Sequence, residues 1–188
     1  MRASLPVRRA TAGAALGTAV HLALEQTDLA DAGAARVLAR AHARALGLGA
    51  ADAERAVLLV DAALASRVLA RARAAPRLWR ELPFTLPIEA GLLEGTVDLA
   101  FEESGKLVIV DYKTDAVPPS GVDARMKTHR RQVAEYALAI GELGGLPVRE
   151  AVVLFLHAAE SRTVHVTPAL LAEVRAGLGK TSPQGALF

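Results

Sequence analysis

Two aspartates and a lysine stand on two strand-like segments, and their spacing favours metal-assisted chemistry. The first segment, 93–101, contains Asp98, and the second, 107–115, contains Asp111 and Lys113. Both segments are rich in aliphatic and β-branched residues, and a short glycine-containing turn separates them, which predicts a β-hairpin. Carboxylates from two paired strands can converge on one cation, and such oxygen ligands favour Mg²⁺, Mn²⁺ or Ca²⁺.

The expected register of this hairpin brings the three charged side chains to one face. A four-residue turn that is symmetric about Glu103 and Ser104 would make the two aspartates diagonal neighbours, with Cα atoms about 7–8 Å apart. Side chains alternate with period two, so both aspartates and the lysine then project from the same face. Two carboxylates there repel each other, and a divalent ion or an ammonium group offsets that cost. The alternative is a strand end at which Asp111 and Lys113 are solvated or paired only with each other.

Five short motifs occur in a fixed order around the hairpin. They are Gly17-Thr18-x-x-His21, Glu81-Leu82-Pro83-Phe84, Gly95-x-x-Asp98, Val110-Asp111-Tyr112-Lys113-Thr114 and Gln132-x-x-x-Tyr136. From about residue 13 to about residue 157, their order and spacing resemble the PD-(D/E)xK nuclease superfamily. Within that superfamily they are similar to the RecB/AddA-type nuclease domains of helicase–nuclease complexes.

The resemblance implies a fold and a site. The implied fold is α/β and restriction-endonuclease-like, with a mixed central β-sheet of about five strands flanked by helices. The implied metal ligands, for one or two Mg²⁺ or Mn²⁺ ions, are His21, Asp98, Asp111 and the backbone carbonyl of Tyr112. Lys113 would orient the attacking water or stabilise developing charge, and Gln132 and Tyr136 would order the edge of the site.

The function that the resemblance implies is that of a Mg²⁺- or Mn²⁺-dependent deoxyribonuclease. It would hydrolyse phosphodiester bonds in DNA repair or recombination, either alone or as the C-terminal module of a helicase–nuclease with a helicase as partner. One alternative is a non-cleaving DNA-binding relative or an interaction module of a repair complex. Another is an unrelated interaction domain in which Asp-x-Lys is a coincidence.

Length and composition limit the number of domains and the classes of protein to which the chain can belong. The 188 residues fit a single domain, 1–188, with a mainly helical part over 1–80, a sheet core with one helix over 81–167, a last helix over 168–180 and a flexible tail over 181–188. Hydrophobic residues make up 52% but aromatic ones only 4%, and no apolar run reaches the roughly 18 residues of a membrane span. We therefore expect a cytoplasmic protein. The absence of cysteine excludes disulfides and iron–sulfur clusters.

Apolar periodicity and breakers predict the remaining elements. Helices are expected over 13–27, 34–46, 51–74, 124–141 and 168–178. Further strands are expected over 84–89, 150–157 and 162–166, the first of them restricted to an edge or an irregular ladder by Pro83 and Pro87.

Basic residues gather at the start of the helix predicted over 124–141. Net charge is only +2 and the pI is about 9.3, which permits nucleic-acid binding without requiring it. The cluster comprises Arg125, Lys127, Arg130 and Arg131. Cations in the first turns of a helix oppose its dipole unless an anion binds there, which favours contacts with DNA phosphates. The alternative is a solvated helix face.

The last five residues suggest a partner. Gln184-x-x-Leu187-Phe188 is similar to the short peptides by which bacterial repair enzymes dock on the replication sliding clamp. The alternative is that this apolar pair folds back on the surface of its own domain, since burying each side chain is worth about 1.5–3 kcal/mol.

Overall fold

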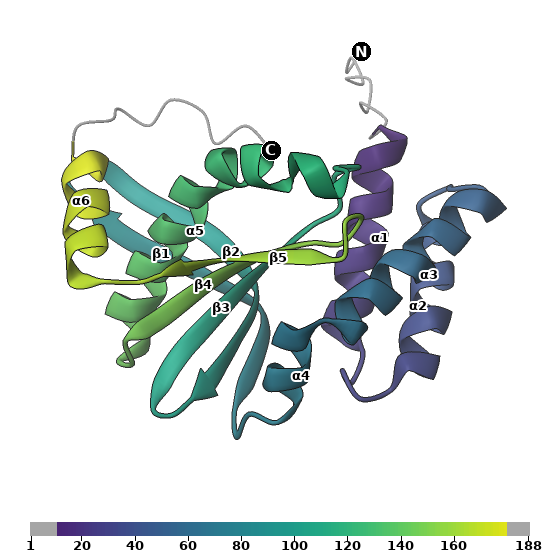
Figure 1. Ribbon diagram of the computed structural model, residues 1–188, viewed down its shortest axis with the longest axis horizontal. Coiled ribbons are helices and arrows are strands. Elements are labelled where there is room, and N and C mark those ends of the chain that lie inside the picture. The colour runs from purple at the N-terminus through teal and green to yellow at the C-terminus, as the bar shows by residue number, and fades with distance from the viewer. Residues whose placement is uncertain (1–10, 180–188) are drawn as a thin grey trace, which may run out of the picture. The chain divides into compact units, whose positions relative to one another are not determined.

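The computed structural model describes residues 11–179 and divides into two compact units, one up to Asp61 and the other from Ala62 onward. Helices come first along the chain, and a mixed five-stranded sheet follows, with one helix inserted between its third and fourth strands (Figure 1). The predicted α/β class with a mixed sheet of five strands flanked by helices is confirmed. Among the described residues, no helix combines the length and the apolar character needed to cross a membrane.

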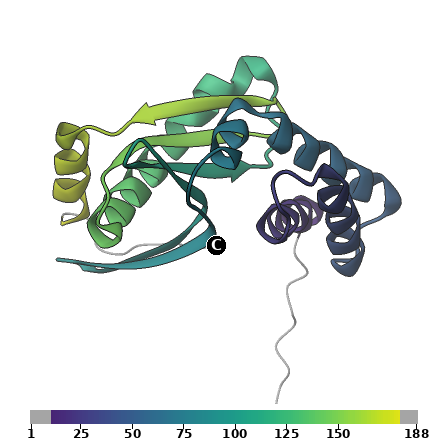
Figure 2. The ribbon, with the colours of Figure 1, turned by 90° about the horizontal axis from the view of Figure 1, so that it is seen from below.

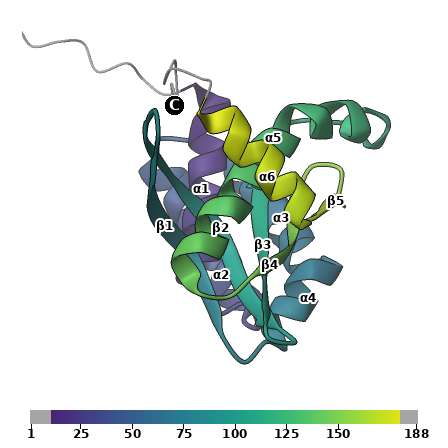
Figure 3. The same cartoon turned by 90° about the vertical axis from the view of Figure 1, so that its left-hand side faces the viewer.

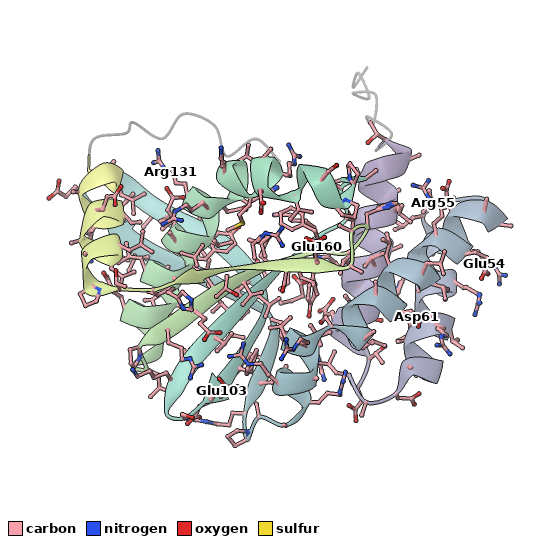
Figure 4. All side chains as sticks on the ribbon, in the orientation of Figure 1. Glu54, Arg55, Asp61, Glu103, Arg131 and Glu160 are labelled. Carbon is pink, nitrogen blue, oxygen red and sulfur yellow. The ribbon has the colours of Figure 1, made fainter. Side chains whose placement is uncertain are left out.

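The first unit is built from helices with small inward faces. It contains α1 (Ala12–Gln26), α2 (Ala32–Ala45) and the greater part of α3 (Ala50–Ala65). Along α2 the fully buried residues are Ala35, Ala39 and Ala43, whose spacing of four residues lets α1 and α2 pack closely. Ion pairs from Arg36 to Asp61 and from Arg40 to Glu54 join α2 to α3 at 2.8 and 2.7 Å (Figure 4).

The helix predicted over 51–74 is interrupted in the structure. A separate helix, α4 (Arg67–Arg73), begins after Ser66, whose hydroxyl accepts a hydrogen bond from the backbone N–H of Leu69. Such a cap satisfies an N–H that a new helix start leaves without an intrahelical partner. The apolar periodicity continues across the break, so periodicity alone predicted one helix.

The second unit contains the sheet and the helices that cover it. The strands are β1 (Leu78–Ile88), β2 (Gly91–Glu103), β3 (Lys106–Lys113), β4 (Val148–Phe155) and β5 (Glu160–His165). They lie in that order across the sheet, and only β3 and β4 run parallel. The parallel pair requires a crossover, which α5 (Val122–Gly144) supplies. α6 (Pro168–Leu178) follows β5 and lies beside α5 (Figure 3).

α5 lies along one face of the sheet (Figure 2). A continuous apolar cluster joins the two. Leu107 and Ile109 of β3 belong to this cluster, together with Val133 and Ala137 of α5. Because strand side chains alternate, the following odd-numbered residues of β3 also point toward α5. The fold therefore directs Asp111 and Lys113 to the face that α5 covers.

The hairpin of β2 and β3 has a tighter turn than predicted. Glu103 pairs with Lys106, so the turn contains only Ser104 and Gly105. Both have positive φ angles, 52° and 71°, as a type I′ turn requires. Phe101 therefore faces Val108 instead of Lys106, and the register predicted from a symmetric four-residue turn is wrong. The partner shifts by two residues, an even number, which by itself keeps the faces unchanged. Val97 nevertheless lies in the same cluster as Ala100, three residues further along β2, so the predicted alternation of this strand fails at its Asp98 end.

Candidate active site

Four side chains from β3 and α5 form a continuous polar chain. The ammonium nitrogen of Lys113 lies 3.1 and 2.8 Å from the two carboxylate oxygens of Asp111. It also donates to Oε1 of Gln132 at 3.2 Å. The amide nitrogen of Gln132 donates in turn to the hydroxyl of Tyr136 at 2.9 Å, one helical turn further along α5. The structure thus brings together four residues that lie up to 25 positions apart in the sequence.

The Asp111–Lys113 pair is largely shielded from solvent. The exposed fraction is 9% for the Asp111 side chain and 18% for that of Lys113. A buried carboxylate is costly unless a cation or hydrogen-bond donors compensate it, so the lysine supplies charge that Asp111 needs here. The solvated strand end that was the alternative for this pair does not describe the structure.

Asp98 reaches the site from β2. The ladder between β2 and β3 ends at Leu99 and Val110, which are the direct chain neighbours of Asp98 and Asp111. The carboxylate of Asp98 accepts a hydrogen bond from the backbone N–H of Tyr112. The diagonal arrangement that was predicted for the two aspartates assumed a four-residue turn, and the structure has a two-residue turn instead.

A third carboxylate, Glu81 on β1, lies next to Asp98. The pairs that flank it, Arg80 with Leu99 and Leu82 with Val97, leave Glu81 opposite Asp98 on the neighbouring strand. A carboxylate oxygen of Glu81 and one of Asp98 lie within 4.8 Å of each other. Glu81 and Asp98 thus lie at matching positions of β1 and β2.

Glu81 also marks a local irregularity of the sheet. Its φ angle is 45°, a left-handed conformation that costs a non-glycine residue about 1–2 kcal/mol. The paired residues Trp79 and Ala100 pack in the cluster beneath α5, and so do the paired residues Leu82 and Val97, although three residues separate them along each strand. The alternation of both strands therefore changes face at Glu81 and Asp98.

In the sequence, Glu81 is part of one of the five motifs, but it was not predicted as a residue of the site. Its strand was predicted to begin at residue 84, whereas β1 begins at Leu78 and includes Glu81. The signal that would have found it is the acidic residue itself, between Arg80 and Leu82 in a segment that alternates poorly. Only the pairing of β1 with β2 shows that Glu81 lies beside Asp98.

Both tyrosines of the region stay protonated. Burial raises the pKa of Tyr136, the hydrogen bond from Gln132 partly opposes this, and the negative charge of Asp111 adds to the increase. Burial also raises the pKa of Tyr112 well above its ordinary value, and Asp98 reinforces the increase. By strand alternation the phenol of Tyr112 lies on the face opposite to Asp111, and the metal contact of its backbone carbonyl stays a prediction.

His129 lies one turn before Gln132 on α5, near the loop that follows β3. Its ring lies 6.0 Å from the ring of Phe155, and its Nε2 atom lies 3.8 Å from a carboxylate oxygen of Asp115. Burial lowers the pKa of His129, Lys113 and Arg125 lower it further, and Asp115 partly opposes them. The neutral imidazole is therefore the favoured form at this position.

The basic residues of α5 divide into two sets. Arg125 pairs with Asp115 at 2.7 Å, and Arg131 pairs with Glu135 at 2.7 Å (Figure 4). Lys127 and Arg130 are exposed, and no ion pair to either is recorded within residues 11–179. Their spacing of three residues places these two on one face of the helix.

Two of the predicted groups are not located relative to this site. His21 lies on α1 in the first unit, and its role as a metal ligand stays a prediction. Gln184, Leu187 and Phe188, the predicted contacts with a sliding clamp, lie outside the described residues.

The donor set suits a small divalent cation. Glu81 and Asp98, at matching positions of β1 and β2 and with carboxylate oxygens within 4.8 Å of each other, provide hard oxygen ligands, which Mg²⁺ and Mn²⁺ prefer. A divalent cation held there would offset the repulsion between these two like charges. The arrangement fits a metal-assisted hydrolase of a phosphate ester.

Curated relatives support this interpretation. Over 162 residues the chain is 33% identical to an ATP-dependent helicase/nuclease subunit from Desulforudis audaxviator, and the match covers 73% of this chain and 13% of the relative. It is 34% identical over 115 residues to the corresponding protein from Acetivibrio thermocellus, covering 53% of this chain and 9% of the relative. The chain therefore spans about one tenth of the length of these relatives.

The fold and a family model agree. The structure of a protein from Eubacterium rectale, described as a candidate exonuclease, superposes with a TM-score of 0.58 at 14% identity. The similarity covers 93% of this chain and 66% of that one, and at such low identity it shows the fold alone. The model of the PD-(D/E)XK nuclease superfamily matches residues 2–182. The motifs, the fold and this match together establish that the chain belongs to the PD-(D/E)XK nuclease superfamily.

Proposed function

We propose that this chain is a metal-dependent DNA nuclease that hydrolyses phosphodiester bonds. The observation that carries the proposal is the polar chain from Asp111 through Lys113 to Gln132, with two further carboxylates, Glu81 and Asp98, on strands of the same sheet. A structural ion pair alone would need neither the additional carboxylates nor a fixed lysine. Partly buried charged and polar groups that converge in this way are typical of catalytic sites.

Asp98, Asp111 and the backbone carbonyl of Tyr112 would hold one or two divalent ions, with Glu81 as an added ligand from β1. When bound, such an ion supplies Lewis-acid chemistry toward the phosphate and acidifies water. His21 is a further proposed ligand, and its imidazole would favour Mn²⁺ over Mg²⁺.

Lys113 would place its ammonium group against the reacting phosphate. There it orients the attacking water and stabilises the charge that develops on the phosphate oxygens. Asp111 and Gln132 hold the lysine from two sides, at 2.8 and 3.2 Å, so little reorganisation is needed when DNA binds. Because the amide nitrogen of Gln132 is engaged by Tyr136, its oxygen is left to face the lysine.

DNA would approach along α5, where Lys127 and Arg130 are exposed and Arg125 and Arg131 lie nearby. These residues would contact phosphates and read no bases. The relatives are named ATP-dependent helicase/nuclease subunits, which supports a role beside a helicase with this chain as the nuclease module. DNA repair or recombination is the process in which we propose that it acts. A non-cleaving DNA-binding relative is the alternative, and the complete set of Asp98, Asp111 and Lys113 argues against it.

The test is cleavage of linear single- and double-stranded DNA with Mg²⁺ or Mn²⁺. We expect the wild-type chain to cleave, Lys113→Ala to be inactive and Lys106→Ala, an exposed lysine at the hairpin turn, to be fully active. Equal cleavage by the wild-type and Lys113→Ala chains would refute the mechanism. Binding without cleavage by the wild-type chain would favour the non-cleaving alternative.

A second measurement tests the metal ligands without relying on activity. Calorimetric titration with Mn²⁺ should show weaker binding for Glu81→Gln, Asp98→Asn and Asp111→Asn, and a smaller loss for His21→Ala. Asp123→Asn, an exposed acidic residue at the start of α5, is the control and should bind as the wild type does. Unchanged affinity in all the ligand variants would place the metal elsewhere.

A further inference from the structure

Gly95 lies where two aromatic rings meet above its bare Cα atom. Phe84 is its cross-strand partner in the pairing of β1 with β2. A Cβ atom at Gly95 would lie 2.7 Å from Cζ and 2.9 Å from Cε1 of Phe84, and 3.1 Å from Cε1 of Tyr136. Real Cβ contacts are almost never this short, so any side chain at position 95 must displace a ring.

The requirement for glycine here comes from close approach and not from the backbone conformation. Gly95 is not among the glycines with a positive φ angle, which are Gly47, Gly91, Gly105 and Gly145. An alanine could adopt the same backbone conformation as Gly95. The missing Cβ therefore serves only to admit the rings of Phe84 and Tyr136.

The two rings fix each other and, through Tyr136, the polar chain of the site. Their centroids lie 5.2 Å apart in an edge-to-face arrangement with an interplanar angle of 70°, a favourable geometry for an aromatic pair. Phe84 is buried, with 6% of its surface exposed. The hydroxyl of Tyr136 then binds the amide of Gln132, and Gln132 binds Lys113.

We propose that Gly95 and Phe84 are positioning residues that act on Lys113 through Tyr136 and Gln132. This inference rests on the proposed nuclease function, in which Lys113 acts on the phosphate. Neither Gly95 nor Phe84 would touch DNA or metal. Together they fix the position of the Tyr136 ring, whose hydroxyl binds Gln132. A displaced ring would therefore shift Gln132 and, through it, Lys113.

The first test replaces Gly95 with alanine and measures the kinetics of DNA cleavage. A displacement of the lysine by a few tenths of an ångström to one ångström should lower kcat roughly 10- to 100-fold, with an unchanged KM for DNA. Gly141→Ala is the matched control, since Gly141 lies on the same helix as Tyr136 and its Cβ would meet only ordinary contacts at 3.9 Å. It should cleave as the wild type does.

Two further variants separate positioning from general damage. Adding Phe84→Leu to Gly95→Ala removes the ring atoms that a Cβ would strike, and should recover part of the lost kcat. In a Gln132→Ala background, Gly95→Ala should lower kcat no further, because the path to Lys113 is already broken. An equal additional loss in that background would overturn the inference.

Thermal unfolding shows whether Gly95→Ala folds. If it does not, the kcat values of Phe84→Leu and Tyr136→Phe test the inference instead. Phe84→Leu should lower kcat in the wild-type chain but not in Tyr136→Phe, which lacks the hydroxyl that binds Gln132. Additive losses would overturn the inference. Failure of the proposed function and failure of this inference give different results. Equal cleavage by the wild-type and Lys113→Ala chains refutes the nuclease mechanism. An inactive Lys113→Ala chain together with a fully active Gly95→Ala chain refutes only the positioning role.

Discussion

Asp98 accepts a hydrogen bond from the backbone N–H of Tyr112 at the end of the ladder between β2 and β3. The last pair of that ladder is Leu99 with Val110, so beyond it a side chain replaces a backbone carbonyl as acceptor. A buried N–H needs such a partner. The same carboxylate that belongs to the proposed metal site therefore also completes the hairpin.

This dual role predicts different effects for two substitutions of Asp98. Asp98→Ala removes the acceptor of the Tyr112 N–H and should lower the free energy of unfolding by about 1–3 kcal/mol. Asp98→Asn keeps an oxygen acceptor and relieves the repulsion with Glu81, so it should stay near the wild type in metal-free buffer. Urea unfolding with a chelator present measures both. Equal stability of the two variants would mean that the hydrogen bond contributes little.

Lys113 should stabilise the protein when metal is absent. Lys113→Ala leaves the buried carboxylate of Asp111 without its closest cation, and we expect a loss of about 1–3 kcal/mol. In an Asp111→Asn background the same substitution should cost much less, since no charge remains to be compensated. Thermal unfolding of the wild type, the two single variants and the double variant in chelator measures the coupling energy between Lys113 and Asp111. Additive effects of the two substitutions would contradict the prediction.

Glu81 should lower the stability of the metal-free protein and strengthen its metal binding. Glu81→Gly relieves the left-handed backbone, and after the entropy cost of glycine we expect a gain of about 0.5–1 kcal/mol in metal-free buffer. The same variant should bind Mn²⁺ more weakly. Ser104→Gly, at the hairpin turn with a φ of 52°, is the matched control and should gain similar stability with unchanged Mn²⁺ affinity. A Glu81→Gly protein with wild-type affinity would remove Glu81 from the site.

His129 should make the protein less stable in mildly acidic solution. Its folded-state pKa lies below its unfolded value, chiefly because burial disfavours the charged ring. The unfolded chain thus binds the proton more readily, so stability is complete above the unfolded pKa of about 6.5 and is lost as the pH falls toward the folded pKa. His129→Gln should flatten this part of the pH profile of unfolding.

Lys127 and Arg130 should supply phosphate contacts that Arg131 supplies less well. Replacing Lys127 and Arg130 by glutamine should weaken DNA binding for all sequences and reduce the salt slope by about two units, roughly one for each contact. Arg131→Gln should do less, because Glu135 already engages Arg131 at 2.7 Å. Binding titrations over a range of salt concentrations measure these slopes. An unchanged slope for the double variant would mean that this face of α5 is only solvated.

The sequence by itself predicted the fold class and that Asp111 and Lys113 share a face. Alternation with period two assigns both to one face of the strand, and their side chains pair there at 2.8 Å. The same alternation did not predict the change of face at Asp98 on β2. The last helix was equally predictable, because Thr167 and Pro168 are strong start signals, and it spans Pro168–Leu178 as expected.

Only the tertiary structure decided the finer geometry of the site. Glu81 joins Asp98 because β1 pairs with β2, and a pairing between strands leaves no mark on the local pattern of either strand. Gly95 is needed because Phe84 and Tyr136, from β1 and α5, meet over it. The local periodicity of a segment predicts on which face of its helix or strand a residue lies. Contacts between remote segments depend on how whole elements pack, and that packing holds Lys113 between Asp111 and Gln132.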